Sequence, residues 1–304
     1  MTDTDPGPSS PTAAGPDGLG ATHPVPATDS GAPPTASNLA QRRSPSYTLA
    51  FEDLAFLRRE DMRDVRFQLE YAKADTLLRE WGIRSTIIVF GSARTPSPEQ
   101  AQMLLGAAKT PEETDHANSR ALQVHHYEAA RAFGRIASER GGAFAPKNRW
   151  RDNVIATGGG PGIMEAANRG AFELGAPSIG FNITLPTEQQ PNPYTTPELT
   201  FQFHYFAMRK MHLAIRANAL VVFPGGFGTL DELFEILTLE QTGRAQKPVV
   251  LFDKAYWSKV INFEALAEEG MIARQDLQLF TFADTPEEAW AQLVERGVLT
   301  ARPG

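Results

Sequence analysis

Short apolar runs alternate along this chain with longer segments in which apolar residues recur every three or four positions. The first pattern is typical of buried β-strands and the second of amphipathic α-helices. Strands without polar interruptions are covered on both faces, as in a parallel sheet flanked by helices. The alternation therefore predicts an α/β fold with a doubly wound, mostly parallel sheet in a single domain. Helices are predicted at residues 51–81, 98–105, 112–140, 163–174, 207–216, 230–241, 256–270 and 286–296, and strands at 85–90, 153–157, 177–183, 199–206, 218–223, 248–252 and 277–282.

The first 47 residues differ in composition from the rest of the chain. They are rich in Pro, Ser, Thr, Ala and Gly and have almost no bulky apolar side chains, so they cannot bury enough surface to offset the entropy lost on ordering. We therefore expect a disordered leader at residues 1–47, followed by one domain at residues 48–304. The leader has no apolar core of signal-peptide length, and its early charges are acidic, unlike those of a mitochondrial transit peptide. No apolar run elsewhere approaches the roughly 20 residues that cross a bilayer, so a cytoplasmic location is expected.

The charge and the side-chain inventory exclude several classes of function. The 304-residue chain has a net charge of −7 and no block of Lys or Arg, so neither a nucleic acid nor an anionic membrane is expected as a partner. The absence of cysteine removes disulfides, thiolate nucleophiles and Cys-ligated zinc. The histidines show no spacing typical of metal ligands, and neither a metal nor a cofactor is expected. They are His23, His116, His125, His126, His204 and His212.

Three glycine-bearing loops follow predicted strands. They lie at residues 91–94, 158–162 and 224–228, after the strands at 85–90, 153–157 and 218–223. Glycine lets backbone N–H groups approach a ligand, and the N-terminus of the next helix adds unpaired donors and partial positive charge. Ligands of doubly wound sheets bind outside the carboxyl ends of the strands. The three loops are therefore expected to converge on one anion-binding site.

Common nucleotide-binding and hydrolase motifs do not fit. The dinucleotide fingerprint would require Gly at Glu165, and an acidic residue rather than Asn182 at the end of the next strand. Gly-Lys-Ser/Thr, Gly-x-Ser-x-Gly and His-Glu-x-x-His are all absent from the sequence. NAD, the phosphate-loop NTPases, the serine hydrolases and the zinc peptidases are therefore disfavoured.

Spacing alone leaves the role of Glu232 open. Thr229 and Glu232 fit a capping box, in which Thr229 caps a helix and Glu232 binds the backbone N–H of the cap. The same carboxylate, one turn beyond a glycine loop, is also placed for catalysis. Spacing alone leaves the roles of Arg209 and Lys210 open as well, because such pairs are usually exposed charges on an amphipathic helix.

Residues 224–232 match the PGGxGTxxE signature of the LOG (lonely guy) family, the cytokinin-activating nucleotide phosphoribohydrolases that are often labelled lysine decarboxylases. Residues 90–92, 158–164 and 208–211 also resemble segments of that family, in the same order, and the resemblance spans about residues 85–299. It implies a Rossmann-like fold. It also implies hydrolysis of the N-glycosidic bond of a nucleoside 5′-monophosphate, AMP or cytokinin-type, to the free base and ribose 5-phosphate.

The resemblance also implies roles for individual residues. Arg209 and Glu232 correspond to the catalytic pair of the family, with Arg209 facing either the phosphate or the leaving base. Two departures leave the preferred base open: Glu165 replaces a frequent glycine, and residues 97–151 form a longer segment than in the short plant-type enzymes. The substrate-binding residues that it implies are Gly91, Ser92, Gly159, Gly160, Met208, Lys210, Gly225, Gly226, Gly228 and Thr229.

Family members form dimers or higher assemblies, so a homodimer or a higher homo-oligomer is expected, with the helix from residue 51 as a candidate contact. The expected ligand is a small nucleoside monophosphate. A different class of function is a non-catalytic nucleotide-binding sensor or carrier that uses the same loops. A lysine decarboxylase would need pyridoxal phosphate, and no lysine lies in a cofactor motif that identifies it as the Schiff base.

Overall fold

The computed structural model describes residues 37–185, 190–244 and 246–298 of the chain. Contacts divide the chain into two compact units, Met1–Phe56 and Leu57–Gly304. The described part of the first unit contains the short helix α1 (Leu39–Arg43) and the 3-10 turn η1 (Pro45–Tyr47), and neither buries a residue. These local turns stand where no regular structure was predicted. Residues 1–36 of the predicted leader lie outside the described residues, and the division of the chain at residue 47 stays a prediction.

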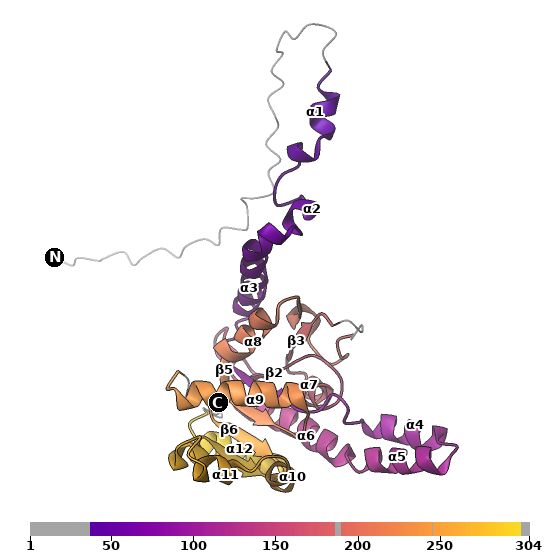
Figure 1. Cartoon of the computed structure of the whole chain (residues 1–304), viewed down its shortest axis with the longest axis vertical. Helices are drawn as coiled ribbons and strands as arrows, with labels where there is room; N and C mark the ends of the chain where they lie inside the picture. The colour runs from indigo at the N-terminus through magenta and orange to yellow at the C-terminus, as the bar shows by residue number, and fades with distance from the viewer. Residues whose placement is uncertain (1–36, 186–189, 245, 299–304) are drawn as a thin grey trace, which may run out of the picture. The chain divides into compact units, whose positions relative to one another are not determined.

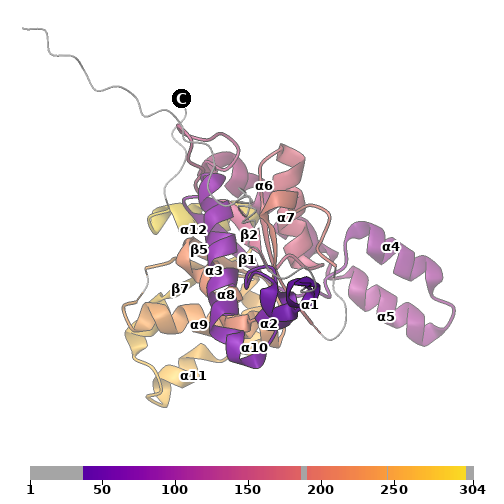
Figure 2. The same ribbon diagram turned by 90° about the horizontal axis from the view of Figure 1, so that it is seen from above.

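The described part of the second unit is built on a seven-stranded sheet with the order β4-β3-β2-β1-β5-β6-β7 (Figures 1 and 2). Every neighbouring pair of these strands is parallel, so the predicted α/β class is confirmed. The strands are β1 (Thr86–Phe90), β2 (Val154–Thr157), β3 (Ile179–Ile183), β4 (Thr200–Phe203), β5 (Ala217–Val222), β6 (Val249–Phe252) and β7 (Phe280–Ala283). The short helix α2 (Leu54–Leu57) spans the boundary between the two units. The helices that follow it are α3 (Arg63–Glu80), α4 (Pro98–Ala107), α5 (Pro111–Ala121), α6 (Val124–Gly141), α7 (Ile163–Leu174), α8 (Phe206–Ile215), α9 (Phe227–Gln241), α10 (Lys254–Val260), α11 (Phe263–Glu268) and α12 (Pro286–Glu295), with 3-10 turns η2 (Glu60–Met62), η3 (Pro197–Leu199) and η4 (Arg274–Gln278).

Alternate residues of each central strand enter two separate apolar layers. In β1, Ile88 and Phe90 pack with side chains of α3, α8, α9, α10 and α11. Ile87 and Val89 point to the opposite face and pack with α6, α7 and α12. Because successive side chains of a strand alternate between faces, strands that are apolar throughout form both layers at once.

The helices α6 and α7 approach each other closely. An added Cβ at Gly170 would lie 1.9 Å from the carbonyl oxygen of Arg131, and one at Gly134 would lie 2.2 Å from that of Ala167. A side chain of any size at either position would collide with the opposite backbone. The two glycines therefore set the spacing between these helices.

Three predicted helices are interrupted. The prediction at 51–81 is wrong around residue 59, because Arg59 is extended and the guanidinium of Arg66 binds the carbonyl oxygens of Leu57 and Arg59. The prediction at 112–140 is wrong around residues 122–123, where α5 ends and α6 begins. The two helices have different partners, because α5 packs against α4 and α6 packs against the sheet. The prediction at 256–270 divides into α10 and α11, because the side chain of Asn262 caps α11 by accepting from the N–H of Ala265 at 3.1 Å.

The helices α4 and α5 form a hairpin that extends away from the sheet in both views (Figures 1 and 2). Both helices begin at capping boxes, made by Ser97 with Gln100 and by Thr110 with Glu113.

Within the described residues, no helix is both long and apolar enough to cross a membrane.

Candidate active site

The sheet brings the loops after β1, β2 and β5 together at its carboxyl edge. The chain runs from β1 outwards to β4 and then returns to place β5 beside β1, so strand order reverses between these two strands. The N–H of Ser92 donates to the carbonyl of Pro224 at 2.9 Å, and the N–H of Ile163 donates to that of Ser92 at 3.1 Å. The prediction that the three loops converge is confirmed. They meet at a topological switch point, where doubly wound sheets bind their ligands.

A cavity of about 690 Å³ opens at this point. Its walls come from the loops after β1 and β5, the beginning of α9, and single side chains of α7, α8 and α10. The lining residues are Phe90, Gly91, Ser92, Ala93, Arg94, Met164, Arg209, Gly225, Gly226, Phe227, Gly228, Thr229, Leu230, Glu232 and Val260. Its volume lies in the usual range for a small-molecule site.

The helix α9 starts earlier than the capping interpretation requires. Its N-cap is Gly226, which makes no side-chain cap, and Phe227 is the first helical residue. Thr229 thus lies inside the first turn and Glu232 in the second, so the interpretation of this pair as a capping box is wrong. The first N–H groups of a helix have no partner within the helix and favour an anion. At α9 the N–H groups of Phe227 and Gly228 belong to residues that line the cavity, whereas the N–H of Thr229 already donates to the carbonyl oxygen of Gly226 at 3.0 Å.

Two of the loop glycines leave room for a ligand, and a third is required by packing. No atom lies within 4 Å of a Cβ built at Gly226 or Gly228. An added Cβ at Gly225 would lie 2.1 Å from Oγ1 of Thr229. The hydroxyl of Tyr256 donates to the carbonyl oxygen of Gly225 at 2.7 Å, which holds the loop in place.

Arg209 and Glu232 face each other in the cavity wall. Nη1 of Arg209 lies 3.6 Å from Oε1 of Glu232, and the two side chains are only 13% and 6% exposed. Nε of Arg209 donates to the carbonyl oxygen of Phe181 in β3 at 2.7 Å. Nη2 lies so near Gly158 that an added Cβ there would be 2.4 Å away. The second glycine loop thus leaves space for the guanidinium rather than for the ligand.

Burial disfavours the charge on both members of this pair. It raises the pKa of Glu232 to about 7, although the positive charges of Lys210 and Arg209 act against the shift. Burial also lowers the pKa of Arg209, and Glu232 and Asp231 only partly compensate. A carboxyl group in a cleft with a pKa near neutral pH can exist in both protonation states during a reaction, which is a common property of catalytic acids and bases.

Lys210 points to a different set of partners. Its ammonium lies 2.7 Å from a carboxylate oxygen of Asp231 and 2.8 Å from one of Glu235. Burial alone would lower its pKa, but hydrogen bonds to these two carboxylates raise it to about 12. Lys210 does not line the cavity, and its role in substrate binding stays a prediction.

Three other predicted residues also lie outside the cavity lining. Gly159 has a φ of +71°, and its carbonyl oxygen accepts from the N–H of Asn192 at 2.8 Å. The carbonyl oxygen of Gly160 accepts from the side-chain amide of Asn192 at 3.0 Å. Met208 packs against the apolar layer that contains α3 and α9. The geometry gives these residues a part in holding the loop and the core, and their substrate contacts stay predictions.

The cavity also contains residues that the sequence did not single out. Arg94 adds a positive charge to the wall after β1, and Phe227, which occupies the variable position of the signature, is 92% exposed. Val260 comes from the end of α10, 28 residues beyond Glu232, and carries no motif. Arg94 is the last residue of the predicted loop at 91–94, and its place in that loop was its only signal in the sequence.

Comparisons with known proteins agree with the signature. A family model described as "Possible lysine decarboxylase" matches residues 164–293. The "Cytokinin riboside 5'-monophosphate phosphoribohydrolase LOG4" of Arabidopsis thaliana is 27% identical over 181 residues, covering 54% of this chain and 83% of that protein. The enzyme of the same description named LOG3, from the same plant, is 28% identical over 147 residues, covering 47% of this chain and 67% of that protein.

A probable enzyme of this description from Oryza sativa subsp. japonica, LOG4, is 29% identical over 147 residues, covering 47% of this chain and 63% of that protein. Among solved structures, the X-ray structure of TM1055 is 21% identical and covers 70% of this chain and 99% of that one, with a TM-score of 0.42. The match of residues 164–293 to the family model and the identities of 27–29% to the plant enzymes confirm the resemblance to the LOG family as a distant homology.

Proposed function

We propose that this chain hydrolyses the N-glycosidic bond of a nucleoside 5′-monophosphate, AMP or cytokinin-type, and releases the free base and ribose 5-phosphate. The observation that carries the proposal is the buried pair of Arg209 and Glu232, 3.6 Å apart in the wall of a cavity at the N-terminus of α9. The distant homology to the phosphoribohydrolases supports the same reaction.

The phosphate would lie on the loop from Gly225 to Thr229. The space around Gly226 and Gly228 allows a phosphate to approach the backbone, and the first N–H groups of α9 supply donors for its oxygens. Arg94, on the opposite loop, adds a positive charge to the same wall. Phe227 is exposed at the cavity and presents an aromatic face on which a base can stack.

The chemistry would centre on Glu232. Cleavage of an N-glycosidic bond places positive charge on the ribose, because the base departs with the bonding electrons and leaves an oxocarbenium-like centre. The ionised carboxylate stabilises this charge and takes a proton from the attacking water, whose oxygen bonds to the ribose, and the departing base takes up a proton from solvent. With a pKa of about 7, the group accepts that proton readily near neutral pH.

Arg209 would stabilise negative charge on the phosphate or on the departing base. Its guanidinium remains protonated, and its place beside Glu232 and Gly158 allows it to donate to a phosphate oxygen or to the departing base. Pairing with Arg209 also holds the carboxylate in one orientation. The variant Arg209→Lys keeps the positive charge but loses the planar guanidinium. It therefore distinguishes the contribution of the charge from that of the guanidinium geometry.

The test is an assay of purified protein for ribose 5-phosphate with a panel of purine and pyrimidine monophosphates. Glu232→Gln should lower kcat by on the order of 10² to 10⁴, the usual contribution of a general acid or base, while the Kd for AMP changes little. The matched control is Glu235→Gln, three residues further along α9, which removes a carboxylate that pairs with Lys210 and does not line the cavity.

Two other outcomes would replace the proposal. Tight binding of AMP without release of ribose 5-phosphate from any substrate, in both wild type and Glu232→Gln, would indicate a nucleotide sensor or carrier. Release of carbon dioxide from lysine with added pyridoxal phosphate would indicate the activity in the description of the family model. The ion pairs of Lys210 argue against that lysine as an amine nucleophile, because an ammonium with a raised pKa rarely loses its proton.

A further inference from the structure

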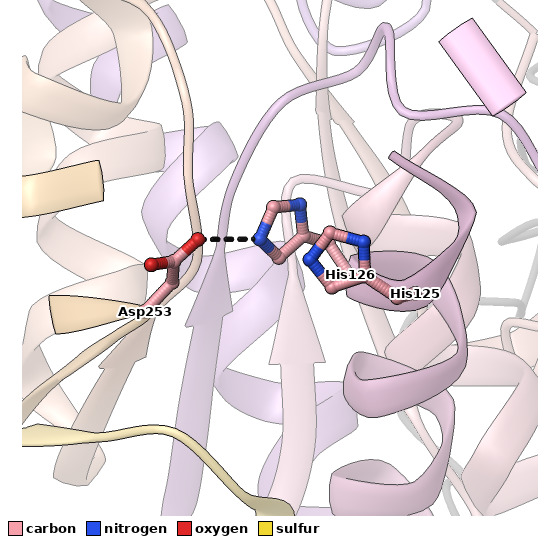
Figure 3. A group of neighbouring side chains, drawn as sticks. All are labelled: His125, His126 and Asp253. Atoms are coloured by element: carbon pink, nitrogen blue, oxygen red, sulfur yellow. Dashed lines mark hydrogen bonds and ion pairs between the residues drawn. The ribbon is translucent and has the colours of Figure 1, made fainter. Parts of the chain in front are cut away.

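A second cluster of side chains lies outside the cavity, where α6 begins and β6 ends. His125 and His126 belong to the first turn of α6, and Asp253 follows β6 directly (Figure 3). One nitrogen from each ring and one carboxylate oxygen lie within 4.8 Å of one another. Two imidazoles and one carboxylate are the donor set of many zinc sites.

The two rings are positioned unusually for neighbours on a helix. Successive helical residues normally point in different directions, yet the ring centroids of His125 and His126 are 3.8 Å apart. Figure 3 shows His126 between Asp253 and His125, with Nε2 of His126 2.8 Å from Oδ2 of Asp253. Ligand atoms around a tetrahedral zinc ion, with bonds of about 2.0–2.1 Å, lie about 3.3 Å apart. Small side-chain rotations therefore suffice to admit an ion.

The surrounding contacts leave one atom of His125 and one of Asp253 available to bind a metal ion. Nδ1 of His125 lies 2.6 Å from the carbonyl oxygen of Leu122. A carbonyl oxygen can only accept, so Nδ1 carries the proton and Nε2 keeps a free lone pair. A backbone carbonyl on the second nitrogen is a usual partner of histidines that bind metals.

Asp253 is held in place by its other carboxylate oxygen. Oδ1 accepts from the N–H of Tyr256 at 3.0 Å and caps α10, which leaves Oδ2 directed at His126. The backbone of Asp253 has a φ of +71°, in the left-handed region that Asp tolerates better than most side chains. The carboxylate is thus fixed between α6 and α10 before an ion binds.

We propose that His125, His126 and Asp253 form a binding site for one divalent transition-metal ion of the zinc class, with water completing its coordination. When Nε2 of His126 binds the ion, the neutral ring carries its proton on Nδ1. Magnesium and calcium suit the site poorly, because they prefer oxygen ligands over imidazole. The proposal is independent of the reaction proposed for Arg209 and Glu232.

The ion would also affect the loop after β5, which contains Gly225. Asp253 is the N-cap residue of α10, and Tyr256 of that helix donates its hydroxyl to the carbonyl of Gly225 in the cavity wall. An ion that fixes Asp253 therefore restrains the end of α10 that supports Gly225. This makes the site a structural clamp next to the cavity rather than part of its lining.

The experiment uses the full chain without a histidine tag, stripped of metal with a chelator. Titration with Co²⁺ should give the visible absorption bands of a tetrahedral complex at one ion per chain, and Zn²⁺ should displace them. Zn²⁺ should also raise the Tm, because an ion that binds only the folded state stabilises it. His125→Ala, Asp253→Asn and His126→Ala should each weaken binding at least about tenfold.

His125 is exposed, so its replacement tests the site without a risk to folding. The matched control is His116→Ala, which removes an exposed histidine from α5 and should leave the titration unchanged. The proposal is overturned if wild type gives no cobalt spectrum and no zinc-dependent rise in Tm. It is equally overturned if His125→Ala binds Co²⁺ with the affinity and spectrum of wild type.

Discussion

At the scale of single residues, Glu232 differs from the other glutamates that follow a Thr-x-x pattern. Glu113 and Glu288 stand in the same spacing after Thr110 and Thr285, and both form true capping boxes. Both threonines are followed by proline, which favours the first helical position. Thr229 is instead preceded by glycines that start the helix at Phe227, so Glu232 falls one turn further in and is only 5% exposed.

The raised pKa of Glu232 makes a prediction about stability. Between pH 4.5 and about pH 7 the folded protein keeps a proton on Glu232 that the unfolded chain releases, so this group lowers the stability as the pH rises. Glu232→Gln removes that effect. Relative to wild type, its free energy of unfolding should rise by up to roughly 3 kcal/mol between pH 4 and pH 8, from a shift of 4.5 to about 7.

Urea unfolding of both proteins at the two pH values measures this difference. Glu235→Gln serves as the control, because its carboxylate is paired with Lys210 and its loss should cost stability at pH 8. A difference between Glu232→Gln and wild type that is the same at pH 4 and pH 8 would mean that Glu232 ionises normally in the folded state.

At the scale of elements, hydrophobic periodicity located the strands and helices but not the interruptions within long helices. The strand β1 and the helix α7 lie where they were predicted, because their patterns are strong and glycines mark their ends. The breaks depend on single polar contacts, such as that of Arg66 with the carbonyl of Leu57. Such contacts join positions that no periodic pattern relates, so the sequence could not show them.

The close packing of α6 on α7 makes a prediction about glycine. Gly170→Ala places a methyl group 1.9 Å from the carbonyl oxygen of Arg131 unless the helices separate. We expect the free energy of unfolding to fall by about 1–3 kcal/mol, as for other overpacked interiors. Gly106→Ala is the control: it also lies in a helix, α4, but in open space, and should gain up to about 1 kcal/mol. A Gly170→Ala variant as stable as wild type in urea would contradict the helix spacing described above.

At the scale of the whole sheet, the strand order determines where the proposed nucleotide would bind. The loops after β1 and β5 flank the switch point and are joined by the bond from Ser92 to Pro224. Addition of AMP to the Glu232→Gln variant should therefore slow amide exchange at residues 90–94 and 224–230. The edge strands β4 and β7 should be unaffected. Protection confined to those edges, measured by mass spectrometry, would place the nucleotide elsewhere.

The sequence predicted the parallel sheet, the convergence of its glycine loops and the family, because glycine, proline and apolar runs are local signals. It did not predict which of the matched residues line the cavity. Lys210 follows Arg209 directly, but one helical step turns it towards Asp231 and Glu235. The cluster of His125, His126 and Asp253 was missed for a related reason: Asp253 lies 127 residues after His126, and only the fold brings it to the two histidines. The oligomeric state and the cytoplasmic location stay predictions.

The hairpin of α4 and α5 has a consequence for engineering. Its helices leave the body just after Arg94, and Arg120 near the end of α5 binds the carbonyl oxygen of Arg94. The turn between the helices, at residues 108–110, is exposed or half-buried. None of its residues belongs to either apolar layer of the sheet. A fluorescent protein inserted there would be joined to α4 and α5, and α5 contacts the cavity wall through the bond from Arg120 to Arg94. The fold thus offers an insertion point for a genetically encoded reporter of ligand binding in the cavity, and titration of such a reporter with AMP would test the proposed function.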